Sequence, residues 1–475
     1  MLGLFGSLNL GQRSLQAHQQ AIEVTGHNLA NVNQAGYARQ RLRIQSSDSL
    51  NSAQGSQGTG IQASAIEQLR SQILDGQIAD EASTRGSLEA MQQAMQQAQS
   101  ILGQSLSRQS SSTQSADAAS QVGDLNELVG LFGDFFNSFQ NLSANPTSED
   151  ARREVISKAQ SLAGRFNVMD QRLGELQGKL LQSAQTDAKT ANQQLADIAS
   201  LNGEIVRAEG GESGAANDLR DTRQQKIEEL AKYVKITTVE AENGAVDISA
   251  GGVSLISEGT MGERLQARTV DGRLEVATAQ SGMRLELDGG SLSGTVEASN
   301  GAVAGLRQNL DNLAKSMITQ VNDIHRGGYD LNGATGQDFF TGTDAASLRV
   351  AQALQDDPDL IQASGDASAR SDNQVALALA QLASAPQASL NNQTFAQNLA
   401  EVVSGVSESL ASVNSELDNQ KVVADTLQKQ RDSVSGVSMD EELTSMVKFQ
   451  KAFEASAKLI TIIDEMLDTV LSLKR

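Results

Sequence analysis

An unbroken ladder of apolar residues runs from position 155 to position 180. Its steps alternate between four and three residues, which is the spacing of one buried helical face. The ladder consists of Val155, Ala159, Leu162, Phe166, Met169, Leu173, Leu176 and Leu180. A less strict continuation reaches Ile205, which predicts a helix of roughly 80 Å at about 1.5 Å per residue. A helix of this length predicts an elongated bundle.

Further helical patterns flank this ladder. Thr147 and Asp150 precede it at the spacing of a capping box. A shorter, Phe-rich pattern covers Leu125 to Leu142, and helical periodicity returns between Leu306 and Ile324. A second long ladder comprises Leu399, Val403, Val406, Leu410, Val413, Leu417, Ala424 and Leu427. These segments are predicted to be the walls of a helical-bundle shaft.

Both ends of the chain carry apolar stripes that repeat every seven residues. The N-terminal stripe comprises Leu8, Leu15, Ile22 and Leu29. The C-terminal stripe comprises Met439, Met446, Phe453, Ile460 and Leu467, flanked by Leu443, Ala457 and Leu471. Heptad spacing is typical of coiled coils, and a single helix with one apolar stripe gains little stability alone. Each terminal helix is therefore expected to need a partner helix.

Residues 233–298 differ from the rest of the chain. They contain short β-branched runs and the turn dipeptides Asn243-Gly244 and Asp271-Gly272, which indicate a small β domain. Helical patterns resume after this segment, so the β domain is an insertion within the helical part of the chain. We therefore expect both termini to lie in one region and the β domain to lie at the end far from them. Two Ser/Gly/Gln-rich segments, 46–60 and 105–121, are expected to be mobile loops.

The predicted fold is mainly α with an inserted small β domain, in an elongated, nested, multi-domain protein. The three expected parts are the terminal helices 1–36 and 440–475 paired as a coiled coil, a helical shaft of residues 37–232 and 299–439, and the β domain 233–298.

Composition excludes several classes of function. The 475 residues carry a formal charge of -21 and no Lys/Arg-rich run, so neither nucleic acid nor an anionic membrane is an expected partner. The absence of cysteine excludes disulfides and thiolate metal sites. The start "MLGLFGSLNLGQRS" lacks the features of a cleaved signal peptide, and no apolar run is long enough to insert in a bilayer.

No catalytic, cofactor or metal site is predicted. His18, His27 and His325 lack ligand spacing, and a G-x-S-x-G nucleophile motif is absent. The segment "GGYDLNGATGQDFF" places Asp330 and Asn332 as in a calcium loop but lacks its glycine and final Glu. We interpret it as a tight turn that leads a Phe pair into the core, and we predict that the protein is not an enzyme.

The stretch "NLANVNQAGYARQR" ends the N-terminal stripe. Asn31 can bond to free backbone groups at the helix end, Gly36 can adopt the left-handed conformation that closes a helix, and Tyr37 anchors a new direction. The alternation of Arg39, Arg41 and Arg43 with apolar residues then predicts a half-buried strand. An ordinary helix cap followed by an edge strand explains these residues as well as a docking elbow does.

This stretch resembles the signature of bacterial flagellar rod and hook axial proteins, matching at Ala30, Asn31, Gly36 and Tyr37. Gln34 and Ala35 differ from the usual Thr and Pro. About half of the chain is similar to the hook-associated proteins of the hook–filament junction. The similar segments are "GTGIQASAIEQLRSQIL", "NDLRDTRQQKIEELAKYV", "VNDIHRGGYDLNGATGQDFF" and the C-terminal "SGVSMDEELTSMVKFQKAFEASAKLITIIDEMLDTVLSL".

The resemblance implies a secreted structural protein of the extracellular flagellum, exported by the type III apparatus without cleavage of a signal peptide. It implies a ring of subunits that joins the hook protein to a second hook-associated protein. It also implies that an export chaperone binds the C-terminal helix through Met446, Phe453, Ile460, Leu467 and Leu471. Two alternatives remain: another hook or rod component, and an extracellular binding module on a helical stalk.

Overall fold

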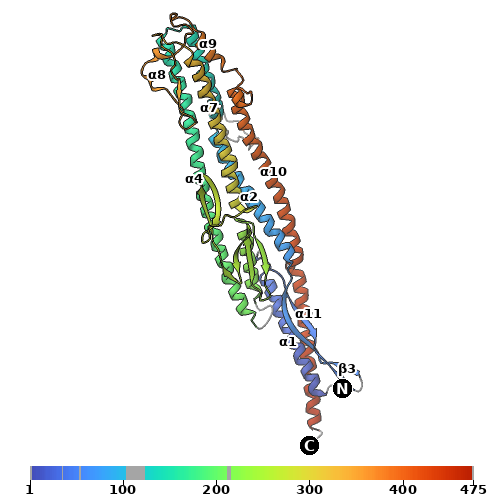
Figure 1. The fold of residues 1–475 in the computed structure, drawn as a ribbon. Helices are drawn as coiled ribbons and strands as arrows, with labels where there is room; N and C mark the ends of the chain where they lie inside the picture. The colour runs from blue at the N-terminus through green and yellow to red at the C-terminus, as the bar shows by residue number, and fades with distance from the viewer. Residues whose placement is uncertain (1–2, 35, 53–54, 103–123, 211–215, 473–475) are drawn as a thin grey trace.

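The computed structural model describes residues 3–34, 36–52, 55–102, 124–210 and 216–472. They form a long, narrow rod in which the first and the last helix lie together at one end (Figure 1). The helices are α1 Leu4–Ala30, α2 Gln72–Ile101, α3 Asp124–Ala144, α4 Glu149–Ala208, α5 Asn217–Ala231, α6 Gly290–Glu297, α7 Ala304–Arg326, α8 Gln352–Asp356, α9 Gln374–Gln381, α10 Phe395–Ser435 and α11 Met439–Ser472, with a π-helical turn at Ala298–Val303 and 3₁₀ turns at Pro358–Leu360 and Ala388–Leu390.

The strands form small antiparallel sheets along this rod. They are β1 Gln40–Ser46, β2 Ser49–Ser52, β3 Gly55–Gly58, β4 Ile61–Gln68, β5 Thr237–Glu240, β6 Val246–Ala250, β7 Val253–Ser257, β8 Thr260–Met261, β9 Leu265–Val270, β10 Arg273–Thr278, β11 Phe340–Thr341 and β12 Arg349–Val350. Among the described residues, β5 to β8 make a four-stranded sheet and the other strands pair in twos. The mainly α, elongated fold predicted from the sequence is confirmed.

Helix α4 is the longest element, a single helix of 60 residues. The predicted ladder forms its buried face, since Val155, Phe166 and Leu173 are each 0% exposed. Its N-cap is Ser148, whose hydroxyl accepts the N–H of Ala151 at 3.3 Å. The prediction of a cap at Thr147 was therefore wrong by one residue, because Ser148 adopts the extended backbone that a capping residue requires.

The shaft has two main hydrophobic cores, one above the other. The upper core lies at the tip, where α3, α7 and the start of α10 meet the first half of α4. It holds most of the phenylalanines, including Phe135, which packs 5.3 Å from Phe139 and 5.8 Å from Phe339 between ring centroids. Phe339 and Phe340 follow the turn capped by Asp330, so that turn does lead a Phe pair into the core.

The strands β5 to β10 lie along the flank of the shaft, against the second half of α4 (Figure 1). The expectation that they occupy the end far from the termini was wrong, because that end is made by α8, α9 and the loops around them. The physical reason is the length of α4: its second half carries its own apolar face, and the strands cover it. That face comprises Ala184, Ala188, Ala191, Leu195, Ile198 and Ile205.

Asparagines on the helices and on the π-helical turn hold several strands in place, three on the flank of α4 and one, β11, at the tip. Each one uses both ends of its amide, accepting from the N–H and donating to the C=O of a single strand residue, as a neighbouring strand would. At distances of 2.7–3.0 Å the pairs are Asn192 with Leu265, Asn202 with Val246, Asn300 with Leu274, and Asn322 with Phe340. The amides satisfy backbone groups that would otherwise be buried without partners.

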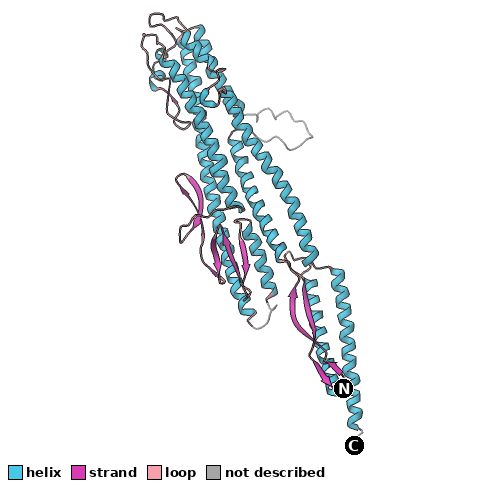
Figure 2. Cartoon of the chain, turned by 45° about the vertical axis from the view of Figure 1, so that its right-hand side comes forward, coloured by secondary structure: helices cyan, strands magenta, loops and turns pink. Residues whose placement is uncertain are grey.

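A long hairpin, β1 with β4, runs beside α1 at the end that carries both termini (Figure 2). Within the expected loop 46–60, β2 and β3 pair from Ser49 with Gly58 to Ser52 with Gly55. The expectation of a mobile loop there was wrong, because backbone hydrogen bonds extend a hairpin even where large apolar side chains are lacking. The other expected loop, 105–121, lies outside the described residues.

Candidate assembly site: the terminal helix pair and its elbow

Helices α1 and α11 lie antiparallel against each other. From the free end toward the shaft, a Cβ at Gly11 would approach Ile460 Cγ1 to 2.9 Å, and the hydroxyls of Ser14 and Ser456 are 3.3 Å apart. The rings of His18 and Phe449 follow at 6.4 Å. The small residues on α1 let the two backbones approach closely, which makes the pair narrow.

The predicted stripe residues lie at the edges of this seam. On α1, Leu8, Leu15, Ile22 and Leu29 are all half-buried. On α11, Met446, Phe453, Ile460 and Leu467 are half-buried, while Leu471 is 66% exposed. Sequence reasoning missed the row that faces α1 most directly, which comprises Glu442, Phe449, Ser456 and Ile463. That row repeats every seven residues too, but its Glu and Ser do not look like buried positions.

The pair leaves a continuous apolar surface uncovered. Leu459 is 39%, Ile462 42%, Met466 50% and Val470 52% exposed, and these residues share one face of the second half of α11. Toward the shaft, Met439, Leu443 and Val447 are also exposed. Contiguous apolar residues on the surface of a strongly acidic chain mark an interaction surface.

The chain leaves α1 through the predicted elbow. Ala30 ends the helix and is exposed, and the Asn31 side chain donates to the carbonyl oxygen of His27 at 3.0 Å. Gly36 has a φ of 76°, the left-handed conformation expected for it. Its carbonyl oxygen accepts from Arg70 at 3.0 Å. A Cβ at Gly36 would lie 2.5 Å from Gln225 Nε2 on α5, so the Gln225 side chain would have to move.

Asn28 is the centre of this elbow and is only 1% exposed. Its amide nitrogen donates to the Gln40 carbonyl at 2.8 Å and to Glu442 Oε2 at 3.0 Å. Its amide oxygen accepts from the Tyr37 hydroxyl at 2.8 Å and from the Gln40 N–H at 2.9 Å. One side chain thus ties α1 to β1, to Tyr37 and to the first turn of α11. Burial, followed by nearby carboxylates such as Asp218, raises the pKa of Tyr37, so its hydroxyl stays a donor.

Arg39 fastens the elbow to both sides of the break between α10 and α11. Its backbone N–H donates to the Ser435 carbonyl at 2.8 Å. Its guanidinium contacts Glu441 at 2.7 Å and Glu442 at 2.6 Å. The Glu441 side chain is 65% exposed, whereas that of Glu442 is 3% exposed, so the second ion pair is the one shielded from solvent.

The shaft supports the elbow through α5. Asp221 accepts the Ala38 N–H at 3.2 Å and pairs with Arg70 at 2.7 Å. Asp218 accepts from the Gln40 side chain at 2.9 Å. Burial raises the pKa of Asp221 to about 6, although Arg70 and the Ala38 N–H act in the opposite direction. This carboxylate therefore ionises close to physiological pH.

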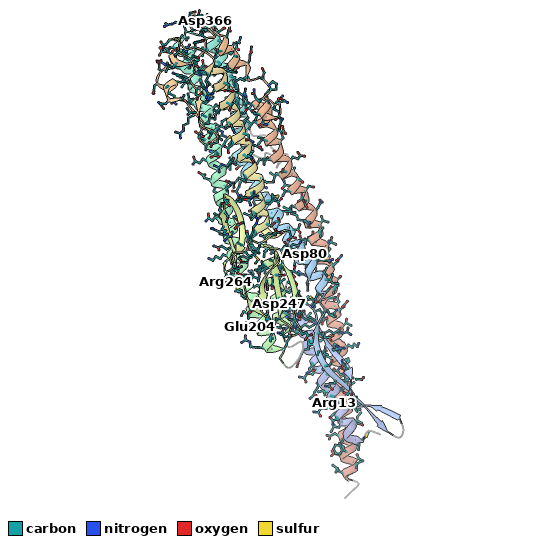
Figure 3. All side chains as sticks on the ribbon, in the orientation of Figure 1. Arg13, Asp80, Glu204, Asp247, Arg264 and Asp366 are labelled. Carbon is teal, nitrogen blue, oxygen red and sulfur yellow. The ribbon has the colours of Figure 1, made fainter. Side chains whose placement is uncertain are left out.

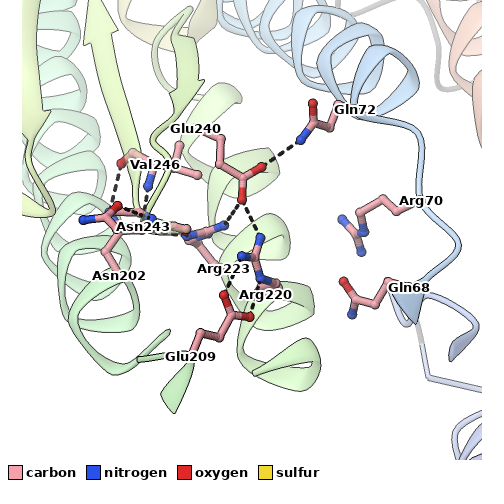
Figure 4. Close-up of polar contacts among 12 residues, drawn as sticks. Gln68, Arg70, Gln72, Asn202, Glu209, Arg220, Arg223, Glu240, Asn243 and Val246 are labelled. Atoms are coloured by element: carbon pink, nitrogen blue, oxygen red, sulfur yellow. Dashed lines mark hydrogen bonds and ion pairs between the residues drawn. The ribbon is translucent and has the colours of Figure 1, made fainter. Parts of the chain in front are cut away.

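A second polar cluster joins α5 to the start of α2 and to β5 (Figure 4). Arg220 holds Glu209 with two hydrogen bonds, at 2.8 and 2.7 Å, and also contacts Glu240. Glu240 accepts from the side chain of Gln72 at 2.7 Å. Burial is the main cause that lowers the pKa of Arg223 to about 10, which leaves this residue charged at neutral pH.

A cleft of about 2330 Å³ lies between the hairpin, the start of α2 and α5. Its charged lining includes Arg70, Arg220 and Glu240, which already bind one another or neighbouring carboxylates and amides. Across the described part of the chain, no three His, Asp or Glu side chains are grouped to hold a metal ion. Nor is any helix in those ranges both long and apolar enough to cross a membrane.

Comparison with known proteins connects this arrangement to one family. Residues 126–340 match the flagellar hook-associated protein FlgK helical domain, and residues 428–473 match the flagellar basal body rod FlgEFG protein C-terminal module. Flagellar hook-associated protein 1 of Bacillus subtilis (strain 168) is 26% identical, over 99% of this chain and 99% of its own. Over nearly its whole length, this chain is similar to flagellar hook-associated protein 1.

Two further proteins show the same similarity. Flagellar hook-associated protein 1 of Escherichia coli (strain K12) is 23% identical over 98% of this chain and 99% of its own. The flagellar hook junction protein FlgK from Burkholderia pseudomallei has the same fold, with a TM-score of 0.64 and 14% identity over 76% of this chain and 100% of that one. As a hook-associated protein, this chain is an extracellular structural component of the bacterial flagellum and not an enzyme.

Proposed function

We propose that the protein forms the junction between the flagellar hook and the filament, as a ring of subunits held together by their α1–α11 pairs. The observation that carries this proposal is the uncovered apolar face of α11, with Leu459, Ile462, Met466 and Val470 exposed. In a ring, each subunit buries this face against a different surface of its neighbour, because a head-to-tail interface repeats until the ring closes. The hook protein would contact one side of the ring and the second hook-associated protein the other.

We propose three parts for this role: an assembly layer made by residues 1–36 and 440–475, a shaft of residues 37–232 and 299–439, and the β domain of residues 233–298. The extension of the α1–α11 pair beyond the end of the shaft supports this division (Figure 1). So does the difference in exposure, since Phe135 and Leu162 in the shaft are 0% exposed while Phe5 on α1 is 75% exposed.

We further propose that the terminal helices order fully only when subunits assemble. Their seam includes Gly11, Ser14 and Ser456, which bury little apolar area, and their largest apolar side chains remain partly exposed. Neighbouring subunits would supply the missing burial. Limited trypsin digestion tests this: in the monomer, Arg13 and Lys458 should be cut before the shaft site Arg172, and in the assembled flagellum they should be protected. Figure 3 shows Arg13 near the free end of the rod.

Slow cleavage of the monomer at Arg13 and Lys458, relative to Arg172, would contradict coupled folding and assembly. Helix α11 also has a role before assembly. We propose that a flagellar export chaperone covers the stripe from Met446 to Leu471 in the cytoplasm, and that the type III apparatus exports the chain without cleavage of a signal peptide. Copurification of the chaperone with the full chain, and its loss when residues 440–475 are removed, would test that binding.

The decisive test is electron microscopy of cells that lack the gene, together with a blot for flagellin in the medium. Bare hooks and secreted flagellin monomers are the expected result, because export works while the adapter between hook and filament is missing. Full-length filaments would refute the junction role. Absence of hooks would instead assign the protein to the hook or the rod.

A further inference from the structure

Apolar packing between α1 and α11 does not by itself fix how the helices align along their length. The rungs Met446, Phe453, Ile460 and Leu467 repeat every seven residues and are all half-buried. A slip of one heptad, about 10 Å along the helix, brings Phe453, Ile460 and Leu467 to the places of Met446, Phe453 and Ile460. A ring of identical subunits, however, needs one alignment in every copy.

The row of α11 that faces α1 most directly differs from these rungs, because it contains a buried charge. Glu442 is 2% exposed, and its two carboxylate oxygens have separate partners: Arg39 Nη2 at 2.6 Å and Asn28 Nδ2 at 3.0 Å. The equivalent positions one and two heptads further along α11 are Phe449 and Ser456, neither of which is charged. A slip of one heptad would therefore leave Glu442, Arg39 and the Asn28 amide without these partners.

The partners of Glu442 are themselves fixed to the shaft. The Arg39 N–H binds the Ser435 carbonyl at 2.8 Å, and the neighbouring Ala38 N–H binds Asp221 at 3.2 Å. Only residues 436–438 separate α10 from α11. The Glu442 carboxylate and its two donors therefore lie where the helix pair joins the shaft. The alignment that they set there continues along α1 and α11.

We propose that Glu442 is a positioning residue that sets the register of α1 against α11. A single buried polar group in an otherwise apolar seam is an established way to specify the register of paired helices, because every other alignment leaves that group without partners. The importance of this register for assembly rests on the proposed function, since a uniform register gives each subunit the same assembly surface. It concerns the pairing within one subunit and can be tested apart from assembly.

The chain contains no cysteine, so introduced cysteine pairs report the register without background. Ser14→Cys with Ser456→Cys joins positions whose hydroxyls are 3.3 Å apart and reports the native register. Ser14→Cys with Ile463→Cys reports a slip of one heptad, in which Asn28 would face Phe449. Each pair is placed in the full chain, oxidised, and quantified as the fraction cross-linked within one polypeptide, in the monomer and in assembled flagella.

With Glu442 present, the first pair should cross-link efficiently and the second hardly at all. Glu442→Leu should raise cross-linking of the second pair several-fold at the expense of the first. Glu442→Gln, which keeps the shape and an acceptor oxygen, should fall between. Glu441→Gln is the matched control: it removes the exposed carboxylate that also binds Arg39, at 2.7 Å, and should leave the native register unchanged. Circular dichroism should show a folded shaft in all variants.

Exclusive cross-linking of the native pair in Glu442→Leu would overturn the proposal and leave the junction role untouched. The same shift of register in Glu441→Gln would also overturn it, because a general loss of acidic charge would then be the cause. If neither pair cross-links in the unsubstituted background, either in monomers or in flagella, then α1 and α11 do not pair as described. That result would overturn both the register proposal and the assembly layer of the proposed function.

Discussion

Asp221 on α5 accepts the backbone N–H of Ala38 at 3.2 Å, so that a buried carboxylate of the shaft holds the chain where it leaves the terminal helix pair. Burial raises the pKa of this carboxyl group from 3.8 to about 6. A carboxyl group whose pKa is higher in the folded than in the unfolded state binds its proton more tightly when folded. Its stabilising contribution is complete below pH 3.8 and is lost as the pH rises through about 6.

We therefore predict that Asp221→Asn makes the stability of the elbow less dependent on pH between about 4 and 7. The difference in unfolding free energy between the variant and the unsubstituted protein should change by up to about 3 kcal/mol across this window. Hydrogen exchange of the amides in residues 36–40, followed at several pH values, measures it. Parallel pH profiles for the two proteins would contradict the prediction.

A charge placed in the helix seam should prevent assembly without unfolding the shaft. Leu15 and Phe453 are half-buried between α1 and α11. Leu15→Asp or Phe453→Asp would leave a partly buried, unpaired carboxylate, at a cost of about 1–3 kcal/mol. Filament formation should be lost, while circular dichroism of the purified variant shows a folded shaft. Gln16→Asp and Ala455→Asp place the same charge at exposed neighbouring positions and should assemble. Normal filaments made from stable seam variants would argue against this seam.

Replacing Gly36 by alanine should cost more stability than its left-handed backbone conformation alone explains. Gly36 and Gly272 have nearly the same φ, 76° and 75°, but only the Cβ of an alanine at position 36 would collide with Gln225. Gly272→Ala therefore measures the left-handed conformation by itself, about 1 kcal/mol. Gly36→Ala should lower the thermal melting temperature of the elbow more than Gly272→Ala lowers that of the β9–β10 turn. Equal losses would mean that the Gln225 side chain moves aside without cost.

Asn202 should be required for holding the β sheet on α4. It is 0% exposed and exchanges two hydrogen bonds with Val246, while its oxygen also accepts from Arg223 at 2.9 Å. Asn202→Leu keeps the size but leaves the N–H and C=O of Val246 buried without partners and removes one acceptor from Arg223, which should cost about 2–4 kcal/mol. Faster proteolysis within residues 237–278, with the tip core unaffected, is the expected result. Asn419→Leu, at an exposed position on α10, provides the control.

Short-range sequence patterns predicted the features that depend on residues close together in the chain. The four-three ladder gave α4 and its buried face, the turn dipeptides gave Gly244 and Gly272 their left-handed conformations, and Gly36 closes the elbow as expected. Each of these depends on side chains within about two helical turns of one another, or on the conformational freedom of one residue. The heptad stripes likewise located both terminal helices, and the similarity of the C-terminal segment pointed to the correct family.

Other features follow only from segments that are distant in the sequence. The strands lie on the flank of α4 because its second half presents an apolar face there, which the spacing of the β segment does not reveal. Glu442 looks like a solvated residue at a helix start, yet Asn28 binds it at 3.0 Å from 414 residues away. The sequence by itself determined the helices with a clear apolar period, which are α1, α3, α4, α7, α10 and α11, because these depend on short-range periodicity. The tertiary structure decided which polar groups are buried and where the sheets dock, because a buried charge or amide is stable only where distant segments supply its hydrogen-bond partners.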